Sequence, residues 1–149
     1  LVSRCAEFHR IAAFLNRCTD KPVGIILSIG LLNELFKAKW SSNLTGGLLE
    51  SFGRLFKEGM TLLVFPWKNR QTGEIVTAET FQAPENCVHL YRHFVENGRI
   101  QGVRCDHEDL LFATGRDVFR MILAGDARWH DLVPEEAWPM AESHARLAE

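Results

Sequence analysis

The sequence has no long hydrophobic run. Its longest apolar segment, Val23–Leu32, contains ten residues and is interrupted by two glycines, whereas a helix that crosses a bilayer needs roughly 20 apolar residues. The N-terminus also lacks a basic stretch followed by an apolar one, which is the pattern of a signal peptide. We therefore expect a cytoplasmic protein without a membrane partner. Because the chain begins at Leu1 rather than at Met, it is also compatible with a fragment of a longer protein.

Cysteine is scarce and widely spaced. The four cysteines, Cys5, Cys18, Cys87 and Cys105, form no C-x-x-C pair. This spacing excludes a disulfide scaffold and favours free thiols in a reducing compartment.

Motifs for catalysis are missing as well. The sequence contains no G-x-S-x-G, no H-x-G-H and no P-loop pattern. His89 and His93 are four residues apart, a spacing that suits a metal, and Cys105 and His107 could join them. However, no carboxylate stands in the H-E-x-x-H arrangement, and both histidines lie on the polar face of the helix predicted there. We assign no metal site, no catalytic residue and no cofactor, and a metal enzyme or hydrolase is the third-ranked hypothesis.

The charge balance is nearly neutral overall but uneven along the chain. Lys and Arg number 17 and Asp and Glu 19, which gives a net charge of −2, so no global basic field attracts nucleic acid. Residues 1–74 hold 10 basic and 6 acidic residues, whereas residues 75–149 hold 7 and 13. Every lysine lies in the first half.

Apolar runs alternate with amphipathic segments. This pattern predicts a single α/β domain over residues 1–149, with a small, mostly parallel sheet flanked by amphipathic helices and a helical C-terminus. The first strand, 23–29, is apolar on both faces, which predicts a central position. Strand 74–80 alternates and is expected to be antiparallel at an edge. The predicted strands are 23–29, 61–65, 74–80 and 99–103, and the predicted helices are 4–18, 31–39, 48–58, 84–97, 106–112, 115–124 and 135–147.

One candidate anion site lies at the start of the helix 48–58. Thr45, Gly46 and Gly47 precede that helix, and unpaired backbone N–H groups at a helix N-terminus can hold a phosphate or carboxylate. Arg54, together with two nearby lysines, could add positive charge. The alternative is that Thr45 or the preceding Asn43 merely caps the helix.

A second candidate lies at the start of the helix 115–124. Thr114 and Gly115 precede it, and Arg116 and Arg120 project from one side because they are four residues apart. This arrangement could clamp an anion. The alternative is a helix capped by Thr114 and Asp117, with two solvated arginines.

The third candidate is the loop 66–73. It carries Lys68 and Arg70 beside an aromatic residue and several amide or hydroxyl side chains, and it follows a buried strand, where α/β proteins bind ligands. The alternative is a hairpin that turns at Thr72 and Gly73.

The segment Phe112–Ile122, followed by Gly125–Pro134, resembles the C-terminal part of nucleotidylyltransferases of the NMN-adenylyltransferase type. The resemblance covers about 25 residues and lacks the family's H-x-G-H signature. It implies that Thr114 and a nearby arginine contact a nucleotide triphosphate. The family's main arginine falls on Phe119, or on Arg120 with a one-residue slip.

Two function classes therefore stand first. The favoured one is a nucleotide- or phosphometabolite-binding α/β domain of nucleotidyltransferase type, which would hold phosphates with backbone N–H groups and arginines. The alternative is a non-catalytic protein–protein interaction or assembly domain, suggested by the charge split and the four tryptophans. In the second case the partner includes a second copy of the chain, forming a homo-oligomer.

Overall fold

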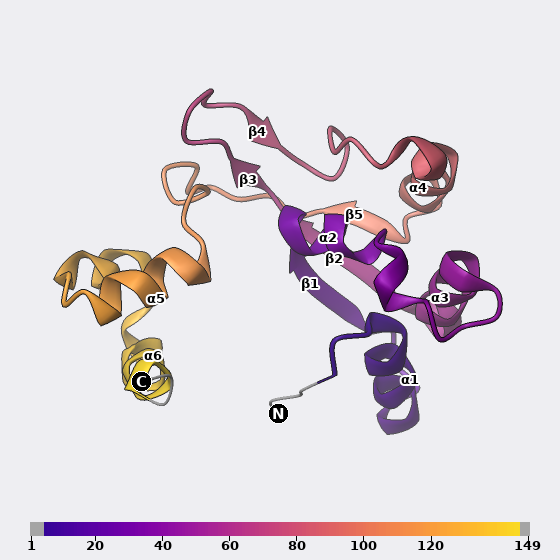
Figure 1. Cartoon of the computed structure of the whole chain (residues 1–149), viewed down its shortest axis with the longest axis horizontal. Coiled ribbons are helices and arrows are strands. Elements are labelled where there is room, and N and C mark those ends of the chain that lie inside the picture. Colours follow the sequence, from indigo (N-terminus) through magenta and orange to yellow (C-terminus); the bar gives the residue numbers. More distant parts are fainter. Residues whose placement is uncertain (1–4, 147–149) are drawn as a thin grey trace. The chain divides into compact units, whose positions relative to one another are not determined.

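Three parallel strands between residues 24 and 102 form one sheet (Figure 1). A computed structural model describes residues 5–146. The strands β1 (Gly24–Ser28), β2 (Thr61–Phe65) and β5 (Ile100–Gly102) stand in the order β1-β2-β5. The chain passes from β1 to β2 through α2 (Ile29–Leu35) and α3 (Gly47–Leu55), and α4 (Val88–Glu96) precedes β5. The predicted α/β class with a small parallel sheet is confirmed.

Helices α2, α3 and α4 pack on one face of this sheet. The register pairs Leu27 with Val64 and Leu62 with Ile100, and paired residues point to the same face. All four side chains are buried. Strand β2 therefore contributes the middle of the core.

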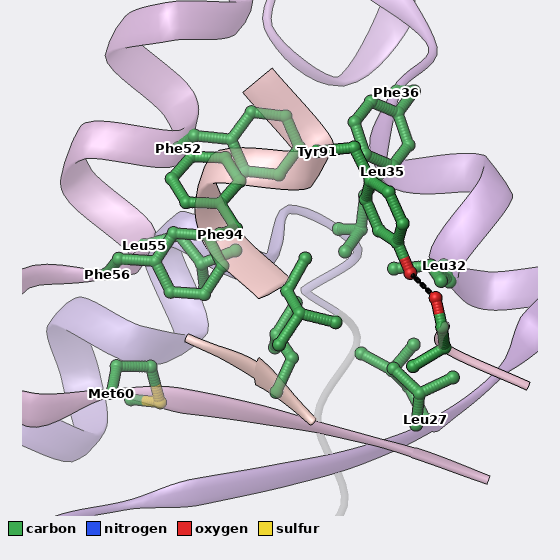
Figure 2. Close-up of a cluster of buried hydrophobic side chains, with 14 of the residues drawn as sticks. Leu27, Leu32, Leu35, Phe36, Phe52, Leu55, Phe56, Met60, Tyr91 and Phe94 are labelled. Carbon is green, nitrogen blue, oxygen red and sulfur yellow. Dashed lines mark hydrogen bonds between the residues drawn. The ribbon is translucent and has the colours of Figure 1, made fainter. Parts of the chain in front are cut away.

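Aromatic rings fill the space between the helices (Figure 2). The ring of Phe94 from α4 lies 5.1 Å from Phe52 and 4.5 Å from Phe56, measured between centroids. The Tyr91 hydroxyl donates a hydrogen bond of 2.5 Å to the backbone oxygen of Ala78, so its polar end is satisfied within the core. Burial raises the pKa of Tyr91, which keeps this hydroxyl as a donor.

The opposite face of the sheet is apolar and exposed. Ile26 on β1 is 67 % exposed and Phe65 on β2 is 39 % exposed, and Leu63, which pairs with Ile26, is half-buried. The predicted central position of the first strand is wrong, because β1 is an edge strand and β2 is central. Apolar residues on both faces of a strand predict burial on both sides, whereas one face of β1 is open.

Helix α1 (Phe8–Cys18) packs against α3. Its apolar stripe enters the core through Ala12, which is fully buried, and through Phe8 and Leu15 at the margin. The basic residues Arg10 and Arg17 remain exposed. The amphipathic helix predicted over 4–18 is confirmed from Phe8 onward.

Helix α2, which directly follows β1, begins earlier than predicted. Ser28 ends β1 and caps α2, because its hydroxyl accepts a hydrogen bond of 3.4 Å from the N–H of Leu31. Helix α2 then ends at Leu35, and a 3₁₀ turn (Ala38–Trp40) follows. The predicted helix 31–39 is therefore divided.

The predicted strand 74–80 is much shorter. Strand β4 (Ile75–Val76) pairs with β3 (Trp67–Lys68) in a separate antiparallel hairpin. It stops there because the Thr77 hydroxyl accepts hydrogen bonds from the backbone N–H groups of Glu79 and Thr80, which turns the chain.

The chain divides into two compact units, the N-terminal unit (residues 1–106) and the C-terminal unit (residues 107–149). The C-terminal unit contains α5 (Gly115–Leu123), 3₁₀ turns at Ala127–Leu132 and Glu135–Ala137, and α6 (Trp138–Arg146). Its buried centre is Trp129, whose ring stacks on His130 with centroids 4.0 Å apart. The helical C-terminus is confirmed, with residue 147 of the predicted helix outside the described residues.

The helix predicted over 106–112 is wrong. Residues 108–112 form turns held by bonds three residues apart, such as Leu110 N–H to His107 O. A segment this short cannot easily offset the cost of starting a helix. No helix among residues 5–146 is long and apolar enough to cross a membrane.

Candidate functional site

The turn before α3 is closed by the side-chain carboxylate of Glu50, a residue of that helix. Glu50 accepts a hydrogen bond of 2.8 Å from the N–H of Gly46, and this bond, aided by Arg54 at 2.6 Å, lowers the pKa of Glu50. A carboxylate therefore already occupies the place where an external anion would meet these N–H groups. Gly47 adopts a left-handed backbone, with φ of 54°, which explains a glycine there. The N-cap residue of α3 is Gly46, which has no side-chain cap, so Glu50 rather than Thr45 or Asn43 closes this turn.

The turn before α5, unlike that before α3, has a side-chain cap. Thr114 and Asp117 form a reciprocal capping box, with Thr114 Oγ1 accepting from the N–H of Asp117 at 3.2 Å. Gly115 follows the cap, and Arg116 and Arg120 are exposed on α5. This turn belongs to the C-terminal unit and the Thr45 turn to the N-terminal unit.

The third predicted site is a hairpin connection. Lys68 is the last residue of β3, and Arg70 lies in the turn that returns to β4. The side-chain oxygen of Asn69 accepts hydrogen bonds from the N–H groups of Gln71 and Thr72. Gly73 completes the turn with φ of 72°. The side chains of this loop organise the hairpin itself.

A basic groove lies instead between α1 and the C-terminal end of α3. We use the term "basic groove" for a cavity of about 410 Å³ whose wall holds four cations, Arg10, Arg17, Arg54 and Lys57. Glu58 is its only acidic wall residue. The remaining wall residues are His9, Ala13 and Asn16.

Three of the four cations of the groove pair with a carboxylate and still keep donors available. Arg10 pairs with Glu7 at 3.4 Å, Arg54 with Glu50 at 2.6 Å, and Lys57 with Glu58 at 3.4 Å. A guanidinium carries five N–H donors, so a single carboxylate leaves several of them for a ligand. All three cationic side chains are more than half exposed, and exposed pairs are weak.

An apolar pocket of about 320 Å³ adjoins the groove. Its wall is formed mainly by hydrocarbon and aromatic side chains from α1, α2 and α3. The polar groups in the wall are engaged: Glu34 accepts bonds from Lys37, Lys39 and Trp40 Nε1, and the two lysines lower its pKa to about 2. The wall residues are Cys5, Ala6, Phe8, His9, Ile11, Leu31, Glu34, Leu35, Trp40, Ser51, Phe52 and Leu55.

His9 stands at the boundary between the two cavities, because it lines both. Its side chain is 4 % exposed, and its Nδ1 lies 3.3 Å from Ser51 Oγ. Burial lowers the pKa of His9 most, Arg54 and Arg10 lower it further, and Glu7 and Glu50 raise it. The imidazole is therefore neutral at pH 7.

Sequence reasoning placed Arg54 near an anion site but missed the groove. Arg10 and Arg17 are seven residues apart and so lie on one side of α1, and Arg54 near the end of α3 is three residues from Lys57, which starts the following 3₁₀ turn. That periodicity was a usable signal. The pairing of the two helices, about 40 residues apart in sequence, was not.

Comparisons with known proteins returned nothing: no family model, no curated protein and no solved structure matches this chain. The resemblance of residues 112–134 to nucleotidylyltransferases therefore stays a prediction. Among residues 5–146, no group of three or more His, Cys, Asp or Glu side chains is placed to hold a metal ion.

Proposed function

We propose that the chain is a binding domain for a nucleotide or another small phosphorylated molecule, held in the basic groove. The observation that carries this proposal is the convergence of Arg10, Arg17, Arg54 and Lys57 on one cavity of about 410 Å³. Arginine forks and lysine ammonium groups form the strong, charge-assisted hydrogen bonds that phosphates accept.

The charges in the groove wall favour an anion rather than a cation as the ligand. The wall holds four basic groups and one acidic group, and Glu7 and Glu50, which pair with Arg10 and Arg54, are not among the wall residues. Neutral His9 adds a hydrogen-bonding ring without repelling the cations. Because the cations are exposed, binding should weaken as salt concentration rises.

Nucleotidyl transfer is the finer form of this proposal. It rests on the resemblance of residues 112–134 alone, and the groove supplies binding groups rather than an assigned nucleophile or base.

Calorimetric titration with inorganic phosphate and ADP tests the proposal. Wild type should bind at least one of them, and a ligand present at 100 times its Kd should raise the free energy of unfolding by about 2.7 kcal/mol. Arg17→Gln and Lys57→Gln should each weaken binding, whereas Arg92→Gln, an exposed arginine on α4 outside the groove, serves as the matched control. Equal affinity in all four proteins would reject the groove as the site.

A second candidate function, assembly with a second copy of this chain, is favoured by the open sheet face. Parallel sheets are normally covered on both faces, yet Ile26 and Phe65 are exposed on β1 and β2. Residues 1–106 carry a net charge of +3 and residues 107–149 a net charge of −5, so opposite charges on two copies can attract.

Light scattering over a concentration and salt series tests this assembly. A dimer that dissociates in Ile26→Asp, and not in Leu49→Asp on the exposed side of α3, would support it. A monomer at every concentration would reject it.

A further inference from the structure

We infer that the ligand carries a hydrocarbon chain beside its phosphate, so that it is a single-chain anionic amphiphile rather than a nucleotide. This inference rests on the proposed function, since it takes the basic groove as the site of the phosphate. It adds the apolar pocket as the site of the rest of the ligand.

The two cavities are neighbours. His9 lines both, and the α1 residues on either side of it divide between them: Arg10 belongs to the groove, and Phe8 and Ile11 to the pocket. Successive residues of one helix point in different directions, and the inference places the ligand over His9, with one end against each wall. Its anionic end would meet the cations, and its other end would enter the pocket.

The apolar pocket offers a ligand hydrocarbon contacts rather than hydrogen-bonding partners. Seven wall side chains are purely hydrocarbon: Ala6, Phe8, Ile11, Leu31, Leu35, Phe52 and Leu55. The wall's polar side chains already bond within the protein.

Those bonds engage Glu34, Trp40, Ser51, Cys5 and the Nδ1 atom of His9. Glu34 accepts from Trp40 and two lysines, Ser51 bonds His9 at 3.3 Å, and the Cys5 thiol donates to Glu7. A nucleobase buried here would lose its bonds to water without replacing them, which costs free energy. A hydrocarbon chain has no such groups to satisfy.

The size of the pocket points to one chain. Its volume of about 320 Å³ lies at the small end of the range of roughly 300–1,000 Å³ for ligand pockets. A single alkyl or acyl chain of moderate length fits this description better than the two chains of a membrane lipid.

Titration with inorganic phosphate, butyl, hexyl and octyl phosphate, octanol and ADP, below the micelle-forming concentration, tests the inference. Affinity should rise by up to about fourfold for each added CH₂ group until the pocket is full. Octyl phosphate should bind more tightly than inorganic phosphate, octanol or ADP.

A cavity-filling variant locates the chain. Ala6 lines the pocket and its side chain is exposed, so Ala6→Trp should narrow the pocket without disturbing the core. We expect it to remove the gain from chain length and to leave the affinity for inorganic phosphate unchanged. Leu49→Trp, on an exposed position of α3 outside both cavities, is the matched control and should behave as wild type.

The outcomes separate the two proposals. If phosphate binds in the groove but chain length adds nothing, or if ADP binds more tightly than octyl phosphate, the inference is overturned and the proposed function stands. Equal gains from chain length in wild type and Ala6→Trp would also overturn the inference, because the chain would then bind elsewhere. If none of the phosphates binds, both proposals fall.

Discussion

The Nδ1 atom of His9 lies 3.3 Å from the hydroxyl oxygen of Ser51. This contact joins α1 to α3 at the point where the basic groove meets the apolar pocket. Because His9 is 4 % exposed, the contact replaces hydrogen bonds that the ring would otherwise make with water. The boundary between the two cavities therefore depends on one neutral imidazole.

Acidification should destabilise the protein through His9. Burial lowers its pKa below the ordinary value of 6.5, with Arg54 and Arg10 adding to the effect and Glu7 and Glu50 opposing it. The folded state therefore binds a proton less readily than the unfolded state, so stability is full above pH 6.5 and is lost as pH falls toward the folded pKa. Chemical denaturation of wild type and His9→Asn at several pH values measures this.

The asparagine variant should show a smaller loss of stability just below pH 6.5, because it lacks the titrating group. The glutamates with lowered pKa values have an ordinary pKa of 4.5 and a lower pKa in the folded protein. They therefore affect stability at a lower pH than His9 does. Parallel stability curves for the two proteins across this window would contradict the account.

Neighbouring residues of β2 should differ sharply in their contribution to stability. Leu62 is fully buried on the core face, so Leu62→Ala should cost about 2–5 kcal/mol. Leu63 lies on the open face and is half-buried, so Leu63→Ala should cost less than half as much. Urea unfolding of both variants gives the comparison, and similar losses would show that the open face is covered.

The hydroxyl of Tyr91, the single tyrosine, should contribute to the stability of the folded protein. Tyr91→Phe keeps the ring contacts but leaves the buried backbone oxygen of Ala78 without its donor. We expect a loss of about 1–3 kcal/mol in the free energy of unfolding. Arg92→Ala, an exposed position on the same helix, is the control, and an unchanged stability of Tyr91→Phe would refute the role of this bond.

The turn at Thr114 should matter for stability and not for phosphate. Thr114→Ala removes the side-chain acceptor for the Asp117 N–H, and losing a helix cap of this kind costs about 1 kcal/mol. Thermal unfolding and a phosphate titration on the same variant separate the two roles. A weaker affinity for phosphate would restore Thr114 and Arg116 as an anion site.

Local sequence patterns predicted the bounds of a strand or helix well where residues at its start or end signal a boundary. Strand β2 runs from Thr61 to Phe65 as predicted, because an apolar run stands between Gly59 and Pro66. Helix α5 also matches closely, since Thr114 and Asp117 mark its start. In both cases the structural signal lies within a few consecutive residues.

Local patterns could not predict how elements that are distant in sequence pack together. The edge position of β1 follows from the strand order β1-β2-β5, which the composition of one strand cannot show. The groove brings Arg17 next to Lys57, although 40 residues separate them. Sequence reasoning instead chose glycine turns at helix starts, where Glu50 and Asp117 already bond the backbone.

The most direct test of the phosphate-binding groove is an amide NMR titration of the full chain with octyl phosphate and inorganic phosphate. Both ligands should shift the amide signals of Arg17, Arg54 and Lys57 around the groove, and octyl phosphate should in addition shift those of Phe8 and Leu31 at the pocket. Shifts that gather at Gly46 and Gly115 while the groove residues stay unchanged would contradict the account.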